Sequence, residues 1–313
     1  MIPREPARMQ ARASPRGCKQ AARQEGRQQW RMKTPDRLRP LQDEGLIDAV
    51  QRQLMSGKEA MVFVVRCGDD TRCAKVYKEA THRSFRQAVD YTENRKTKNS
   101  RQARAMAKGT KFGRQAMEAA WQSAEVDALY RLAAAGVRVP KPYNFHEGVL
   151  LMELVVDANG DAAPRLNDMA FAADEARAHH ATLIREVVRM LCAGVVHGDL
   201  SEFNILVAAD GPVIIDLPQA VDAAGNNHAA AMLERDVANL RHYFGRFAPE
   251  LLRTDYGREI WSIYEKGLLT PDTELTGHFR QKFKPVDLGQ VLAVIDDAKD
   301  EEAARRLRMS QAR

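Results

Sequence analysis

HGDLSEFNILVAADGPVIID, residues 197–216, is the stretch that decides the fold. Within it, two apolar runs flank an Asp-Gly dipeptide, which is a strong signal for the turn of a β-hairpin. Asp199 and Asn204 stand at the start of the first run, and Asp216 ends the second. The pattern therefore predicts that these three polar side chains lie close together at one end of a small hairpin.

Two carboxylates and one amide in this arrangement are the set that phosphoryl transfer requires. One carboxylate orients or deprotonates the acceptor, while the amide and the second carboxylate hold magnesium on the phosphates. His197 opens the same stretch but has no partner at metal-ligand spacing. We therefore expect His197 to brace the loop rather than to bind a metal.

Phosphoryl transfer also needs a cation on the nucleotide phosphates, and Lys75 is the candidate. It stands inside an apolar run, where a lysine is costly without a paired charge. Glu125, in the middle of an otherwise apolar helical pattern, is the expected partner. Taken alone, these residues could be an edge-strand lysine and a solvated helix position. Their order before the hairpin motif favours a phosphotransferase site.

Apolar periodicity predicts the other elements of the chain. Helical spacing is found at 43–54, 115–135 and 174–194, strand-like runs at 61–65, 72–78 and 149–156, and helices again after residue 228, the last from about Leu288. Ala248-Pro249-Glu250 is interpreted as a helix start with proline in its first turn. Strands come early and helices late, which predicts an α+β fold of two lobes, the first rich in sheet and the second helical and reduced. The predicted division is a tail at 1–40, an N-lobe at 41–155, a C-lobe at 156–285 and a C-terminal helix at 286–313.

Composition excludes several classes of protein. The chain of 313 residues is 44% hydrophobic and 29% charged, as expected of a globular protein large enough to bury a core. No apolar run approaches the roughly 18 residues of a membrane helix, so we expect no membrane partner. The four cysteines have neither CxxC nor zinc spacing, and we interpret them as reduced thiols of a cytoplasmic protein.

The net charge of +6 is concentrated in two segments. Residues 1–40 carry 11 Lys/Arg against 3 Asp/Glu, and residues 81–114 carry 10 against 2. The first has too few large apolar groups to form a core, and we expect a disordered basic tail; the second reads as a flexible, partly helical insertion. Each segment is either simply solvated or a docking surface, the tail for nucleic acid and the insertion for RNA or an acidic protein.

Seven short motifs are found between residues 42 and 250: MSGKEA, CAKVYK, WQSAEVDAL, VRVPKP, LLMELV, VVHGDLSEFNILV and VIIDLPQAVD. Together they resemble the RIO family of atypical serine protein kinases. HGDLSEFN followed by IDLPQAV differs from ordinary kinases, which carry HRD and DFG, and from aminoglycoside and choline phosphotransferases. The sequence departs from many relatives at Gly198, where they have alanine.

The resemblance implies a role for each motif residue. Lys75 would hold the α- and β-phosphates and pair with Glu125, Asp199 would be the catalytic aspartate, and Asn204 and Asp216 would bind Mg²⁺. In the loop that stands in for a glycine-rich loop, Ser56, Gly57 and Lys58 would lie over the phosphates, with Ser56 and backbone amides as donors. Cys73 would face the adenine, Met152 would be the gatekeeper, and Glu153 to Val155 would form the hinge that binds adenine.

Three functions follow from these expectations. The first is an ATP- and Mg²⁺-dependent serine/threonine protein kinase, whose protein substrate the sequence does not name. The second is an ATPase switch that forms an aspartyl phosphate at Asp216 and acts in ribosome or ribonucleoprotein assembly. The third is a small-molecule phosphotransferase, which a short C-lobe disfavours. His228 follows Asp216 by only 12 positions (228 − 216), too few for a long activation loop and for ordinary peptide docking.

Overall fold

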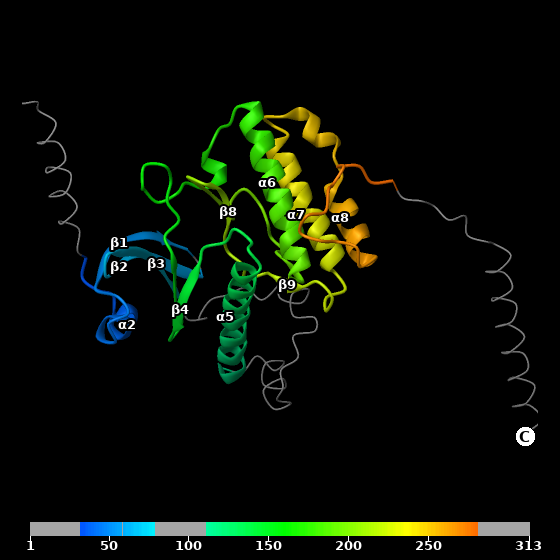
Figure 1. The fold of residues 1–313 in the computed structure, drawn as a ribbon. Coiled ribbons are helices and arrows are strands. Elements are labelled where there is room, and N and C mark those ends of the chain that lie inside the picture. The colour runs from blue at the N-terminus through cyan, green and yellow to red at the C-terminus, as the bar shows by residue number, and fades with distance from the viewer. Residues whose placement is uncertain (1–31, 58, 79–110, 281–313) are drawn as a thin grey trace, which may run out of the picture. The chain divides into compact units, whose positions relative to one another are not determined.

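The structure, a computed structural model, describes residues 32–57, 59–78 and 111–280, with the backbone alone described in 111–121. The chain divides after Gly277 into two units, and the first contains all the helices and strands of these described ranges. A five-stranded antiparallel sheet comes first and a group of helices follows it (Figure 1). The predicted α+β fold, with a sheet-rich N-lobe and a helical C-lobe, is confirmed.

The N-lobe sheet has the strand order β1-β2-β3-β5-β4. Its strands are β1 (Ala49–Ser56), β2 (Ala60–Cys67), β3 (Asp70–Tyr77), β4 (Pro142–His146) and β5 (Val149–Glu153). The predicted hairpin of β2 and β3 is present, with Val62 opposite Lys75. Gly68 in its turn has φ +62°, a left-handed conformation that glycine adopts without strain. Strand β5 was predicted, whereas β4 was not.

The two faces of β3 pack against different partners because side chains alternate along a strand. Ala74 and Val76 belong to a buried cluster with Leu38 and Leu41, which lie in and just before the short helix α2 (Arg39–Asp43). Tyr77 points the other way, into a cluster that includes residues of the long helix α5 (Lys111–Ala134). Lys75, two residues earlier, therefore shares the α5 side of the sheet.

Two predictions near the N-terminus are wrong. The helical spacing at 43–54 belongs to the end of α2 and to strand β1, because Gly45 adopts φ +73° and ends the helix and the following residues pair with β2. The tail boundary at residue 40 is also too late. Residues 36–38 form the 3₁₀ helix η2 (Asp36–Leu38), whose Leu38 is buried in the core.

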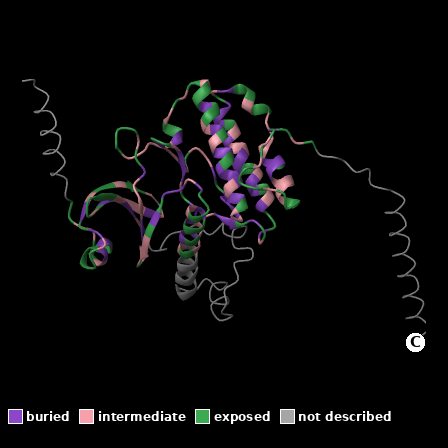
Figure 2. Ribbon diagram, viewed as in Figure 1, coloured by how far each residue is buried: buried purple, intermediate pink, exposed green. Residues whose placement is uncertain are grey.

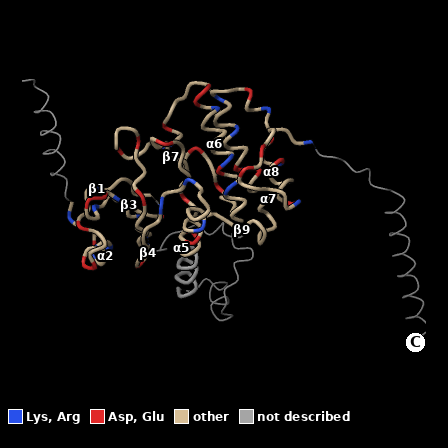
Figure 3. Tube along the Cα trace, in the orientation of Figure 1, with Lys and Arg blue, Asp and Glu red and all other residues tan. Residues whose placement is uncertain are grey.

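The C-lobe is built on α6 (Ala173–Cys192), α7 (Ala229–Phe244) and α8 (Tyr256–Glu265). Leu183, Val187 and Leu191 form the buried stripe of α6 at helical spacing, and burial of each contributes about 1.5–3 kcal/mol. Buried and exposed residues alternate around α6 and α7 in Figure 2. Basic and acidic residues are interspersed along the described chain (Figure 3). The predicted helix end at Gly194 is confirmed, with φ +73°.

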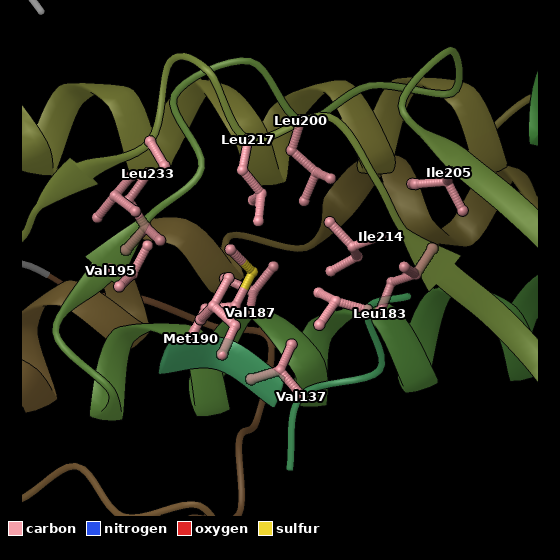
Figure 4. Close-up of a cluster of buried hydrophobic side chains, with 14 of the residues drawn as sticks. Val137, Leu183, Val187, Met190, Val195, Leu200, Ile205, Ile214, Leu217 and Leu233 are labelled. Carbon is pink, nitrogen blue, oxygen red and sulfur yellow. The ribbon is translucent and has the colours of Figure 1, made fainter. Parts of the chain in front are cut away.

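Two small antiparallel pairs of strands lie between α6 and α7 in the sequence. They are β7 (Ile205–Ala208) with β8 (Gly211–Ile214), and β6 (Val195–Val196) with β9 (Val221–Asp222). Ile205 and Ile214 lie in the same buried cluster as Leu183 and Val187, so the hairpin sits directly on α6 (Figure 4). The cluster fixes the hairpin, and with it the polar residues at its end.

The remaining predictions divide between the described and the undescribed residues. The turn around Pro249 does begin a helix, the 3₁₀ helix η5 (Pro249–Arg253), and a second one, η4 (Leu166–Asp168), was not predicted. Residues 1–31, most of the insertion at 81–114, and the last helix from about Leu288 lie outside the described residues. In the part of the chain that is described, no helix has the length and apolar character needed to cross a membrane.

Candidate active site

Lys75 is the centre of an ion-paired group that joins three elements of the fold. Its Nζ lies 2.5 Å from Oε1 of Glu125 on α5 and 2.9 Å from Oδ1 of Asp216, which follows β8. The Lys75 and Glu125 side chains are 13% and 5% exposed, and that of Asp216 is 44% exposed. The predicted pairing of Lys75 with Glu125 is confirmed, and Asp216 is a second partner.

The charges of this group stabilise one another. Burial alone would lower the pKa of Lys75, but the carboxylates of Glu125 and Asp216 raise it above its usual range, so the ammonium stays charged. Burial likewise opposes ionisation of Asp216, yet Lys75 holds the net pKa of that carboxyl below its usual value. At neutral pH the group is therefore a buried cation between carboxylates, the arrangement that orients a lysine toward phosphates.

Asp216 has an unusual backbone as well as an ion pair. Its φ of +67° lies in the left-handed region, which costs most non-glycine residues energy and is tolerated best by Asn and Asp. The neighbouring residue Ile215 donates its amide to the carbonyl of Asn204 at 3.0 Å. The hairpin therefore brings Asn204 beside the residue that precedes Asp216, as the sequence predicts.

The loop before the hairpin is held by its own side chains. His197 is buried; its Nδ1 accepts the amide of Asp199 at 3.3 Å and its Nε2 donates to the carbonyl of Ile215 at 3.2 Å. Both ring nitrogens are thus used inside the loop, which confirms the bracing role. The Asn204 amide nitrogen donates to the Asp199 carbonyl at 2.9 Å, and the Asp199 side chain itself is exposed.

Asp236 on α7 also holds this loop, and its role was not predicted from the sequence. Its carboxylate accepts the amides of Gly198 at 2.8 Å and Leu200 at 3.0 Å. Burial raises the pKa of Asp236 to about 6 despite the lowering effects of His197, these two amides and Arg235. One signal could have found it, because Asp236 lies on the apolar stripe of α7 between Leu233 and Leu240, where an acid requires a partner.

Asn204 and Asp216, the residues expected to bind magnesium, each have an oxygen atom that could act as a ligand. The Asn204 nitrogen is directed at Asp199, which leaves its Oδ1 as an acceptor, and Asp216 uses Oδ1 for Lys75 while Oδ2 has no hydrogen-bond partner in the described residues. Mg²⁺ commonly binds one or two protein oxygens together with phosphates and water. No cluster of three or more His, Cys, Asp or Glu capable of holding a metal occurs in the described ranges. One amide oxygen and one carboxylate oxygen fit a metal whose other ligands would be phosphates and water.

Arg138 holds the end of β5, where the hinge is predicted to begin. Arg138 donates to both carboxylate oxygens of Glu153 at 3.0 Å and to Asp210 at 3.1 Å, so it ties the hinge to the turn of the β7–β8 hairpin. The Glu153 amide donates to the carbonyl of Lys141 at 2.8 Å. Glu153 is one of the residues of the predicted hinge, and its side chain and amide are both engaged within the protein.

Cys73 and Met152, two other residues predicted to line an adenine site, lie next to each other in the sheet. Cys73 is opposite Met152 in the sheet and, two residues before Lys75, shares its face of β3. Burial raises the pKa of the Cys73 thiol to about 12, so it behaves as an apolar group. Val155 is 4% exposed, and its amide has no acceptor within the described residues. Buried amides are nearly always paired, so this one is suited to a ligand.

The loop between β1 and β2 corrects one expectation. The Gly57 amide, predicted to donate to a phosphate, donates instead to the carbonyl of Ala60 at 2.9 Å. Lys78 donates to the Gly57 carbonyl at 2.6 Å and to Oγ of Ser56 at 3.3 Å, a contact that sequence patterns did not indicate. Lys58 lies outside the described residues. Lys78 therefore holds Ser56 and Gly57, the described residues at the start of this loop.

Comparisons with known proteins agree on one family. The model of the RIO domain matches residues 61–256. The chain is 37% identical to the RIO-type serine/threonine-protein kinase Rio1 of Haloferax volcanii over 66% of this chain and 67% of that protein. It is 35% identical to the Rio1 of Methanocaldococcus jannaschii over 61% of each chain. It is 29% identical to the human serine/threonine-protein kinase RIO1, over 64% of this chain but 34% of that one.

A solved kinase domain is also similar in structure. Its crystal structure superimposes with a TM-score of 0.41 at 14% identity, over 71% of this chain and 67% of that one.

Proposed function

The chain belongs to the RIO family, and from that premise we propose that it is an ATP- and Mg²⁺-dependent kinase that transfers a phosphoryl group to a protein serine or threonine. The curated relatives named above are all described as serine/threonine-protein kinases. The matches cover between about a third and two thirds of those proteins, so the activity of the whole chain, its substrate and its partners belong to this proposal.

One observation carries the proposal, and it is the position of Lys75 between Glu125 and Asp216. Burying a charged lysine costs free energy, and here two carboxylates from distant parts of the chain keep it charged. Salt bridges of this cost serve stability poorly compared with apolar packing, whereas a fixed cation beside a metal-binding carboxylate serves phosphate binding well.

The chemistry would proceed through the residues around the hairpin. Asp199 is exposed and would accept the proton of the acceptor hydroxyl, with its backbone held by His197 and by Asn204. Asp216 and Asn204 would hold Mg²⁺, which when bound neutralises charge on the phosphates. Lys75 would orient the α- and β-phosphates. These roles rest on geometry and on the family resemblance together.

The adenine would lie against the hinge. The Val155 amide, which has no acceptor among the described residues, would donate to it, and Cys73 and Met152 lie opposite each other in the neighbouring sheet. The Arg138 clamp on Glu153 would keep the hinge at a fixed distance from the hairpin that carries Asn204. A fixed spacing of this kind suits a ligand that binds at both ends.

A second candidate is an ATPase switch with a phosphorylated aspartate. The observation that favours it is Asp216 itself, because its low pKa keeps the carboxylate ionised and its side chain is 44% exposed. An ionised, accessible carboxylate can attack a phosphoryl group and release ADP, forming an acyl phosphate. The short path from Asp216 through β9 to α7 also leaves little chain for docking a peptide.

Partners and location remain part of the proposal. The basic segments 1–40 and 81–114 would contact RNA or a ribosomal partner, and a cytoplasmic location would suit both. Most of these segments lies outside the described residues.

The experiment that separates the two candidates follows radioactive phosphate from ATP. Turnover is measured with and without candidate protein substrates, and the labelled chain is denatured and treated with hydroxylamine. A kinase gives hydroxylamine-resistant label on protein serine or threonine. An ATPase switch gives turnover without substrate and hydroxylamine-sensitive label on the chain itself. Absence of any ATP turnover would contradict both candidates.

A further inference from the structure

Arg165 contacts the end of β1, next to the loop predicted to cover the phosphates. Its guanidinium Nη2 lies 3.1 Å from the sulfur of Met55, the residue that immediately precedes Ser56 and Gly57 at the end of β1. Met55 is 42% exposed and Arg165 is partly exposed, so the contact is at the edge of the site rather than in the core. The Arg165 side chain therefore reaches from its own segment to the loop predicted to cover the phosphates.

The backbone of Arg165 is fixed on the opposite side, beside the hairpin. Arg165 pairs with Leu206 of β7 in a β-bridge, and the amide of Val207 donates to the carbonyl of Pro164 at 2.9 Å. Leu206 is only two positions after Asn204. The main chain of Arg165 thus lies near Asn204, a candidate magnesium ligand. Its guanidinium lies next to the loop that begins at Ser56 and is predicted to cover the phosphates.

Among the described residues, the charge of Arg165 has no carboxylate partner. In the described part of the chain its guanidinium forms no ion pair, and a thioether sulfur is only a weak acceptor. Because the guanidinium is also partly exposed, its donors are accessible to a stronger acceptor than a thioether. By contrast, Arg138 and Arg177 each contact two carboxylates.

The field of Arg165 reaches the centre of the site. Burial raises the pKa of Asp216, and Lys75, His197 and Arg165 each lower it. Arg165, from the segment beside β7, and Lys75, from β3, therefore both favour negative charge at Asp216. Two cations from separate elements thus act on the same part of the candidate site.

We propose that Arg165 is a phosphate-binding residue of the nucleotide site, and that its guanidinium exchanges the sulfur of Met55 for oxygens of the ATP polyphosphate when the nucleotide binds. This inference rests on the proposed use of ATP. Planar guanidinium groups form paired, charge-assisted hydrogen bonds with phosphate oxygens, which a thioether cannot match. The residue would thereby favour nucleotides with a polyphosphate over adenosine.

The test compares the affinities of ATP and adenosine, measured by calorimetric titration with Mg²⁺ present, for the wild-type chain and its Arg165→Met variant. Methionine keeps a long, flexible side chain beside Met55 but removes the charge. We expect the variant to bind ATP about tenfold or more weakly, the scale for losing a charge-assisted hydrogen bond. Adenosine affinity should stay unchanged, and Arg165→Lys should recover part of the ATP affinity.

The matched control is Arg52→Met, which removes an exposed arginine from the same strand as Met55 and should leave both affinities unchanged. Unchanged ATP affinity in Arg165→Met would overturn the inference. Equal losses for ATP and adenosine would also overturn it, because they would indicate a structural role. If the wild-type chain binds neither molecule, the proposed function itself fails, and this inference with it.

Discussion

The carboxylate of Asp236 accepts the backbone amide of Gly198 at 2.8 Å, across 38 positions of sequence. Gly198 adopts φ +80°, a left-handed conformation, and directly precedes Asp199. The same carboxylate accepts the amide of Leu200 at 3.0 Å, so the two residues that flank Asp199 are both fixed to α7. The orientation of Asp199 therefore depends on a side chain that has no contact with the site itself.

The variant Asp236→Ala should lose both stability and turnover. Two buried amides would lose their acceptor, at about 1–3 kcal/mol each, and Asp199 would lose its fixed orientation. We expect a lower melting temperature and a kcat that falls more than KM for ATP rises, because Lys75 and Glu125 are untouched. The exposed Asp272→Ala serves as the control and should change neither quantity. Normal kcat in Asp236→Ala would contradict the positioning role.

The pair of Lys75 and Glu125 should behave as a unit. Lys75→Met leaves the Glu125 carboxylate, 5% exposed, without its cation, and breaking a buried pair in this way costs about 3–5 kcal/mol. Lys75→Met with Glu125→Gln should be less destabilised than the sum of the two single variants. Denaturant unfolding of the four proteins measures this coupling. Additive losses would show that the pair is not coupled.

A surface pair provides the comparison. Arg258 and Glu234 have side chains that are 58% and 41% exposed, and exposed pairs contribute about 0–1 kcal/mol. The corresponding double-mutant cycle should therefore show little coupling. ATP affinity should be lost in the Lys75 variant and kept in the Arg258 variant.

His180 should make the fold sensitive to acid. It is 2% exposed and packs on the rings of Phe244 and Tyr256, and burial lowers its pKa from 6.5 to about 4. Between these values the unfolded chain binds the extra proton, so stability falls as pH falls through this window. The loss approaches about 3 kcal/mol near pH 4. The variant His180→Phe removes this contribution.

The measurement is the unfolding free energy of both proteins between pH 7 and pH 4. The wild type should lose stability relative to His180→Phe as the pH falls. Asp236 acts in the opposite sense, since its raised pKa of about 6 favours the folded state as pH falls, but it is common to both proteins and cancels in the difference. A difference that does not change with pH would contradict the prediction.

The parts of the site that sequence could predict are those where a charge stands in an apolar pattern. Lys75 and Glu125 were paired because each needs a counter-charge when buried, and they are within 2.5 Å of each other. The hairpin turn at 210–211 placed Asn204 near Asp216 for a similarly local reason. Asp236 obeys the same rule on α7 and could have been found in the same way.

Other parts depend on partners that no local pattern specifies. Residues 49–54 have helical spacing but form a strand because β2 offers a hydrogen-bonding edge, and tertiary pairing overrides spacing there. Arg138 joins Glu153 to Asp210, and partly exposed charges of this kind carry no periodic signal. The turn made by the Gly57 amide likewise depends on Ala60 and Lys78 rather than on glycine alone.

The central claim is that two aspartates near one end of a hairpin have different tasks. Asp199 is exposed and would act on the acceptor, whereas Asp216 pairs with Lys75 and would hold magnesium. Asp199→Asn should therefore lower the rate by a factor on the order of 10² or more without changing the affinity for Mg²⁺-ATP. Asp216→Asn should weaken the magnesium dependence and the rate together.

The most direct measurement is a magnesium titration of ATP turnover in the wild type, Asp199→Asn and Asp216→Asn. We predict a wild-type midpoint in Asp199→Asn and a midpoint shifted to higher magnesium in Asp216→Asn. The same magnesium midpoint in both variants would contradict the assignment of the two aspartates.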